Sequence, residues 1–93
     1  MGKFRVKVEK LAENDIKKHL KSGNKSSIKK IETFLLELSE HPYTGAGQPE
    51  PLKYELQGKW ARRINSKDRL IYKVDEKVGT VFVISAMGHY LDK

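Results

Sequence analysis

The sequence contains no cysteine, which excludes a disulfide framework, a thiolate metal site and a cysteine nucleophile. It has no apolar stretch long enough to span a membrane, and its N-terminus lacks the apolar segment of a secretory signal. Its three histidines, His19, His41 and His89, are far apart and lack the spacing of a metal site. We therefore expect a cytoplasmic protein without a structural metal.

Acidic residues are in the minority. The chain has 19 lysines and arginines against 12 aspartates and glutamates, so its formal net charge is +7. A small domain this basic typically binds nucleic acid, an anionic membrane surface or an acidic protein. Length sets a further bound, because 93 residues of which 38% are hydrophobic can form one small core. We expect a single domain over residues 1–93.

The hydrophobic pattern of the first half predicts one strand and two helices. Residues 3–10 alternate apolar and charged side chains, as in a half-buried strand. Residues 11–22 and 25–40 repeat apolar positions at helical spacing, and the Gly-Asn pair between them predicts a tight helical hairpin. Ser26 or Ser27 is the expected N-cap of the second helix.

The second half predicts strands after one long loop. Residues 42–51 contain three prolines and two glycines, so we expect a loop there, and such loops often carry functional residues. The short connections between the segments that follow favour an antiparallel meander. The order β-α-α-β-β-β(β) predicts an α+β fold with two helices on one face of the sheet. The expected strands are 52–56, 60–64, 69–74 and 80–86.

A dense group of cations lies on the predicted central strands. Residues 59–73 contain six lysines and arginines against one aspartate, together with Trp60 and Tyr72. Cations and aromatic rings interleaved on strands suit nucleic acid, because cations meet phosphates and rings stack on bases. The alternative is that the aromatic residues belong to the core, and for Trp60 we favour that interpretation.

Arg62 and Arg63 are neighbours on one predicted strand, so they should point to opposite faces of the sheet. A four-residue loop over residues 65–68 would place Arg62 on the same face as Arg69. A loop of three or five residues, or a bulge, would place Arg63 there instead. Both registers stay open at this point, and both arginines are candidates for RNA contact.

Two groups able to transfer protons flank the cationic segment. Glu50 is held between two prolines, which restrict its backbone, and His89 follows the last predicted strand. Cleavage of RNA without a metal needs a base for the 2′-hydroxyl proton, a cation for the phosphorane and an acid for the leaving 5′-oxygen. His19 and His41 have no such surroundings. We interpret His19 as a surface residue and His41 as a helix-end residue.

Four sequence blocks, in this order, are similar to a known family. They are GxGxPEPLK at residues 45–53, LxGxWxRRI at 56–64, RLxY at 69–72 and HY at 89–90. Together they resemble the YoeB/Txe group of the RelE superfamily of bacterial toxins, and the resemblance covers residues 42–90. It implies a RelE-like fold and a toxin that enters the ribosomal A site and cuts mRNA there.

The resemblance also implies roles for individual residues. The family's general base falls on Glu50, its phosphorane-stabilising arginine on Arg69 and its general acid on His89. It implies no metal and no cofactor. Because Arg63 matches a position that lines the family's site, the resemblance favours the register with Arg63 beside Arg69. The residues that it places along the site are Lys53, Arg63 and Tyr90.

Several partners are implied by the same resemblance. One is a YefM/Phd-type antitoxin whose C-terminal segment is disordered when free and folds over the toxin, in agreement with the positive net charge. Others are the 70S ribosome with its mRNA, a second copy of the chain, and DNA reached only through the antitoxin; no membrane is implied. The main alternative is a basic module that binds RNA, the ribosome or an antitoxin without cutting. Glu50 and His89 favour the enzyme, since a tethered carboxylate would weaken simple phosphate binding.

Overall fold

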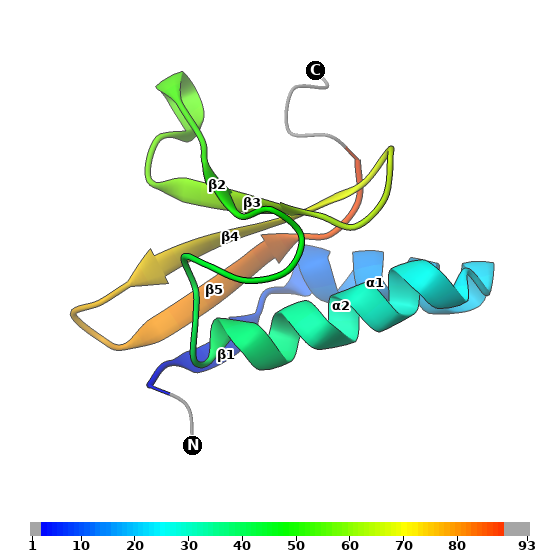
Figure 1. The fold of residues 1–93 in the computed structure, drawn as a ribbon, viewed down its shortest axis with the longest axis horizontal. Coiled ribbons are helices and arrows are strands. Elements are labelled where there is room, and N and C mark those ends of the chain that lie inside the picture. Colours follow the sequence, from blue (N-terminus) through cyan, green and yellow to red (C-terminus); the bar gives the residue numbers. More distant parts are fainter. Residues whose placement is uncertain (1–2, 89–93) are drawn as a thin grey trace.

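Two helices cover one face of a five-stranded sheet (Figure 1). The computed structural model describes residues 3–88. Among these residues, the face of the sheet opposite the helices carries no α-helix, and neither helix has the length and apolar character needed to cross a membrane. The elements are β1 (Arg5–Val8), α1 (Lys10–Ser22), α2 (Lys25–Leu38), β2 (Glu50–Pro51), the 3₁₀ turn η1 (Tyr54–Leu56), β3 (Lys59–Arg63), β4 (Arg69–Asp75) and β5 (Thr80–Ser85).

The strand order in the sheet is β1-β5-β4-β3-β2. The last four strands form the expected antiparallel meander. The first strand runs parallel to the last, with Arg5 opposite Thr80, so the sheet is mixed. The α+β fold with both helices on one face is therefore confirmed.

The main core lies between the helices and the sheet. Phe34 and Leu38 of α2 pack there with Tyr72 and Val83, and all four side chains are at most 1% exposed. Trp60 is half-buried against the same cluster, so the core interpretation of both aromatic residues is confirmed. A second, smaller apolar cluster lies on the opposite face and consists of Leu52, Ala61 and Ile71, with Leu56 and Ile84 packed against it.

The cap of α2 differs from the prediction. Asn24, not a serine, is the N-cap, and its Oδ1 accepts a hydrogen bond from the Ser27 N–H at 3.1 Å. Ser27 is buried, and its hydroxyl oxygen instead accepts from Asn65 Nδ2 at 2.9 Å. An asparagine is as good an N-cap as a serine, and Asn24 directly precedes the first residue of α2.

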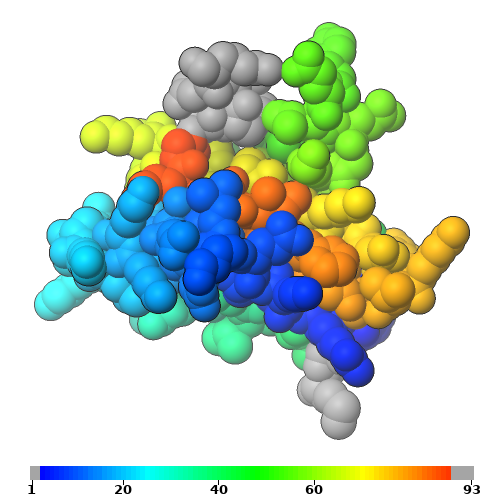
Figure 2. Space-filling model, turned by 180° about the vertical axis from the view of Figure 1, so that it is seen from behind, coloured from blue at the N-terminus to red at the C-terminus, as the bar shows by residue number. Residues whose placement is uncertain are grey.

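Residues 52–56 do not form the expected strand. Pairing in this region is limited to β2, which starts two residues earlier, and one further hydrogen bond from Leu52 N–H to Lys59 O. Tyr54 has a φ of 58°, a left-handed conformation that turns the chain into η1. The η1 segment (green) stands out from the body of the molecule in Figure 2. Leu52 and Leu56 still pack on one cluster, which explains why their spacing resembled a strand.

Candidate active site

The register between β3 and β4 decides which arginine lies on the open face of the sheet. Arg63 pairs directly with Arg69, and residues 64–68 form the connecting loop. The loop therefore has five residues, and the alternative with a four-residue loop is wrong. The loop is closed by the Ile64 N–H, which donates to Asp68 O at 3.0 Å, and by Asn65 Oδ1, which accepts from the Asp68 N–H at 2.9 Å.

Arg63 and Arg69 are therefore like charges opposite each other on one face. Directly opposed residues of antiparallel strands have Cβ atoms about 5 Å apart, where two equal charges repel. Arg63 is exposed, whereas Arg69 is 8% exposed and its Nη1 donates to Asn65 O at 3.2 Å. An anion placed between the two guanidinium groups would remove the repulsion, so this pair suits a phosphate.

Glu50 lies on the same face as the two arginines. It pairs with Ala61 of β3, and Ala61 is two residues from Arg63 on the same strand. Such diagonal neighbours are about 7–8 Å apart between strands. The Glu50 side chain is exposed, as is that of Lys53, which directly precedes η1. The register thus places a carboxylate and a pair of guanidinium groups on one side of the sheet.

The chain after β5 returns to Arg69. The Arg69 N–H donates to Gly88 O at 3.0 Å, and the Gly88 N–H donates to Asp68 Oδ1 at 2.8 Å. Gly88 has a φ of 79°, which favours glycine at this turn. His89 and Tyr90, for which the family resemblance implies the roles of general acid and site-lining residue, follow Gly88 and lie outside the described residues.

Arg62 is the exception among the candidate RNA contacts. Its side chain is 0% exposed and lies on the helix side of the sheet, so its assignment to RNA contact is corrected. Nη1 donates to Glu37 Oε1 at 2.6 Å, and Nη2 donates to the backbone oxygens of His41 and Thr44 at 2.6 and 2.8 Å. The guanidinium therefore ties the loop after α2 to the sheet.

Tyr72 completes the surroundings of Arg62. Its hydroxyl oxygen accepts from Arg62 Nε at 3.2 Å, and its O–H donates to Pro42 O at 2.6 Å. Burial raises the pKa of the Tyr72 phenol, more than the neighbouring guanidinium lowers it. The phenol is therefore neutral at physiological pH and keeps the proton that it donates to Pro42.

The two glycines of the GxG block are required by packing. Gly45 and Gly47 have φ values of 122° and 83°, and a Cβ at either position would collide with the Glu37 carboxylate or with the Phe34 ring, respectively. These glycines let the loop pass close to α2. Since the loop leads directly into β2, they also fix where Glu50 enters the sheet.

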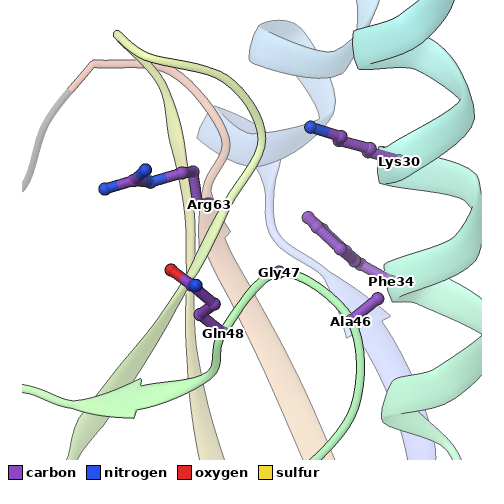
Figure 3. Close-up of a pocket in the computed structure, with 6 residues that line it drawn as sticks. All are labelled: Lys30, Phe34, Ala46, Gly47, Gln48 and Arg63. Carbon is purple, nitrogen blue, oxygen red and sulfur yellow. The ribbon is translucent and has the colours of Figure 1, made fainter.

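A pocket of about 240 Å³ lies next to Arg63, between α2 and the loop. In Figure 3 the Arg63 and Gln48 side chains point away from α2, and Lys30 extends from α2 toward the sheet. Lys30 is thus a third cation, which lines the same pocket as Arg63. It is lined by Lys30, Phe34, Ala46, Gly47, Gln48 and Arg63.

His19 is not the surface residue that the sequence suggested. It is 3% exposed, and its Nε2 donates to the backbone oxygen of Ala86 at 2.7 Å. Asp15, one turn earlier and 6% exposed, accepts from the Ala86 N–H at 3.0 Å. Sequence reasoning missed both residues, although a signal existed: with Ala12 they occupy one face of α1 at helical spacing.

Residues 3–88 contain no group of three or more histidine, aspartate or glutamate side chains arranged to hold a metal ion. Among the described residues, Glu50 supplies an exposed carboxylate on this face, and the pair Arg63 and Arg69 supplies positive charge. His41, the remaining histidine of this part of the chain, is exposed, and its backbone oxygen accepts from Arg62.

The chain is similar to known proteins in both sequence and fold. Residues 9–90 match the model of a family described as the YoeB-like toxin of bacterial type II toxin-antitoxin systems. Toxin YoeB of Synechocystis sp. is 38% identical over 68 residues, which cover 73% of this chain and 77% of the relative.

Two solved structures from Staphylococcus aureus have the same fold. A YoeB dimer has a TM-score of 0.77 at 31% identity and covers 95% of this chain and 99% of its own. A YoeB-YefM complex has a TM-score of 0.74 at 33% identity and covers 94% of this chain and 98% of its own. The motifs, the fold and these likenesses together show that the chain belongs to the YoeB family of type II toxin–antitoxin toxins.

Proposed function

We propose that this toxin is a ribosome-dependent endoribonuclease that cuts mRNA in the A site by metal-free attack of the 2′-hydroxyl on the neighbouring phosphate. The observation that carries the proposal is the opposed pair Arg63 and Arg69 with Glu50 on the same face. A bare pair of like charges is unfavourable in the free protein and becomes favourable once a phosphate lies between them.

The reaction assigns one role to each group. Glu50 takes the proton of the 2′-hydroxyl, and the 2′-oxygen forms a bond to phosphorus. Arg69, with Arg63 beside it, stabilises the extra negative charge on the phosphorane. The bond from phosphorus to the 5′-oxygen breaks, and His89 protonates that oxygen, which leaves a 2′,3′-cyclic phosphate and a 5′-hydroxyl. Lys53 and Tyr90 line the path of the RNA.

The burial of Arg69 supports its place at the phosphorane. Its guanidinium is held by the loop oxygen of Asn65 and is largely removed from water. A cation in such surroundings is preorganised and acts in a lower effective dielectric than a surface lysine. Arg63 and Lys53 are exposed and are better suited to binding the RNA backbone.

The partners follow from the family and from charge. A YefM-type antitoxin is the proposed inhibitor, as in the Staphylococcus aureus YoeB-YefM complex, and a second copy is proposed from the YoeB dimer of the same organism. The net charge of +7 suits both an acidic antitoxin segment and the ribosomal RNA that surrounds the A site. The site of action is then the bacterial cytoplasm, where translation takes place.

The deciding experiment adds purified protein to a reconstituted translation reaction on a defined mRNA and maps new 5′ ends. We expect cuts at the A-site codon that require the ribosome and are lost with His89→Ala. Retained ribosome binding by that variant is the control that separates chemistry from binding. Ribosome binding without any cut by the wild-type protein would reject the enzyme and favour a non-catalytic RNA- or antitoxin-binding module.

A further inference from the structure

Two buried polar side chains of α1 hold the end of β5. Asp15 Oδ2 accepts from the Ala86 N–H at 3.0 Å, and His19 Nε2 donates to Ala86 O at 2.7 Å. Both side chains are at least nine-tenths buried, and Ala86 is 0% exposed. In Figure 2 the end of β5 (orange to red) lies directly against α1 (blue). Two side chains on one face of α1, one helical turn apart, thus bind both backbone groups of Ala86.

Ala86 directly follows β5 and is buried, so its backbone N–H and C=O need partners other than water. Here α1 supplies both partners, and a β-bulge between β4 and β5 at Ile71 and Tyr72 shifts the strand just before it reaches Ala86. Bulges of this kind redirect a strand and are frequent beside functional sites.

Two residues later the chain is held from the other side. Gly88 donates to Asp68 Oδ1 and accepts from the Arg69 N–H, at 2.8 and 3.0 Å. Residues 86–88 therefore pass between α1 and the β3–β4 loop, with hydrogen bonds to both. The residue that follows Gly88 in the sequence is His89, the proposed general acid.

We propose that Asp15 and His19 are positioning residues of the cleavage site: by holding Ala86, they fix the path of residues 86–88 beside Arg69, and His89 is the next residue in the chain. This inference rests on the proposed function. Neither residue touches RNA in this scheme. They act through the backbone, and a displacement of about 1 Å of a catalytic group is enough to lower a rate by about 100-fold.

At each position the test compares a variant that keeps the hydrogen-bonding group with one that removes it. Asp15→Asn keeps an oxygen that accepts from Ala86, whereas Asp15→Ala does not. His19→Gln keeps an N–H donor, whereas His19→Leu does not. We expect Asp15→Ala and His19→Leu to lower the single-turnover rate of A-site cleavage by about 10- to 100-fold with little change in ribosome affinity. Asp15→Asn and His19→Gln should stay close to wild type.

A matched control separates positioning from stability. Val81→Ala removes two methyl groups from a fully buried side chain at the other end of β5 from Ala86. Thermal midpoints and amide hydrogen exchange are measured for every variant. A positioning role predicts faster exchange of the Arg69 and Gly88 amides in Asp15→Ala than in Val81→Ala at equal loss of stability.

The outcomes are distinct. If the wild-type protein does not cleave, the proposed function fails and this inference falls with it. If the wild type cleaves and Asp15→Ala or His19→Leu loses no more activity than Val81→Ala, the two residues are structural only and the inference is wrong. Should Asp15→Ala fail to fold, the comparison of His19→Leu with His19→Gln decides the question alone.

Discussion

Arg62 and Arg63 are adjacent in sequence but lie on opposite sides of the sheet, one fully buried and the other exposed. Arg62 faces α2 and pairs with Glu37 at 2.6 Å, whereas Arg63 faces the open side opposite Arg69. The RRI block of the sequence thus combines one arginine that is buried in the fold with one that is exposed on the open face.

The same substitution at these two positions should have opposite consequences for stability. Arg62→Gln removes the guanidinium that binds Glu37 and the backbone oxygens of His41 and Thr44, so it should lower the free energy of unfolding by at least about 1–3 kcal/mol. Arg63→Gln should leave it unchanged or raise it slightly, since it removes the repulsion with Arg69. Urea denaturation followed by the fluorescence of Trp60 measures both. Equal losses for the two variants would contradict the division of roles.

Arg63 should be visible in the salt dependence of RNA binding. Each phosphate contact to single-stranded nucleic acid contributes about 0.7 to the slope of log K against log salt. Arg63→Gln should therefore weaken binding of a short RNA and reduce that slope by about this amount. Fluorescence anisotropy at several salt concentrations gives the slope. Lys77→Gln, in the turn between β4 and β5, is the matched control and should have a smaller effect.

Glu50 should act on the rate rather than on binding. Glu50→Gln keeps the shape of the side chain but cannot take a proton, so we expect the single-turnover rate of A-site cleavage to fall by about 10²–10⁴-fold. Ribosome affinity should be unchanged or slightly stronger, because a negative charge is removed beside the phosphate. Rate and affinity are measured separately by varying the protein concentration. A variant that binds and cuts like the wild type would exclude Glu50 as the base.

Two tyrosines should make the protein sensitive to alkali. The hydrogen bond to Glu76, together with partial burial, raises the pKa of Tyr43 to about 12, and burial raises that of Tyr72. Because these folded-state values exceed the unfolded value near 10, the stabilisation is complete below about pH 10 and is lost as the pH rises through the folded pKa. Denaturation midpoints should fall over this window.

Tyr43→Phe is the check on that prediction. It removes the phenol that titrates near pH 12, so the variant should lose less stability than the wild type between pH 10 and 12. An ultraviolet titration of tyrosinate should show the same group missing from the last part of the curve. A variant with an unchanged pH profile would assign the effect to Tyr72 alone.

The helices, the meander and the loop could be predicted from sequence because their signals are local. Alternating residues predicted β1, helical spacing predicted α1 and α2, and the proline-rich segment predicted the loop before β2. The failed strand at residues 52–56 shows the limit of this reasoning. Leu52 and Leu56 are apolar because they cover Ala61 and Ile71, and the left-handed Tyr54 that makes this possible carries no local signal.

The candidate site was predicted only as far as residue types allow. Glu50 was singled out by the prolines on either side of it, and the role of Arg69 came from the family resemblance. The choice between Arg62 and Arg63 depended on a loop length that the Asn-Ser-Lys-Asp segment did not reveal. Glu37 could not be predicted as the partner of Arg62, because an ion pair between a helix and a strand 25 residues away leaves no local pattern. His19 looked like a surface residue since its partner is a backbone oxygen.

The parallel pairing of β1 with β5 has a consequence for biosynthesis. Arg5 lies opposite Thr80, so the two strands are separated by 75 residues in the chain, and within the described sheet β1 pairs with no other strand. Contacts this distant form late and slowly. A nascent chain that has not yet emerged as far as β5 lacks the partner of β1 and the Ala86 backbone that α1 holds. The complete sheet and the contacts between α1 and Ala86 therefore form only after residue 86 has left the ribosomal exit tunnel.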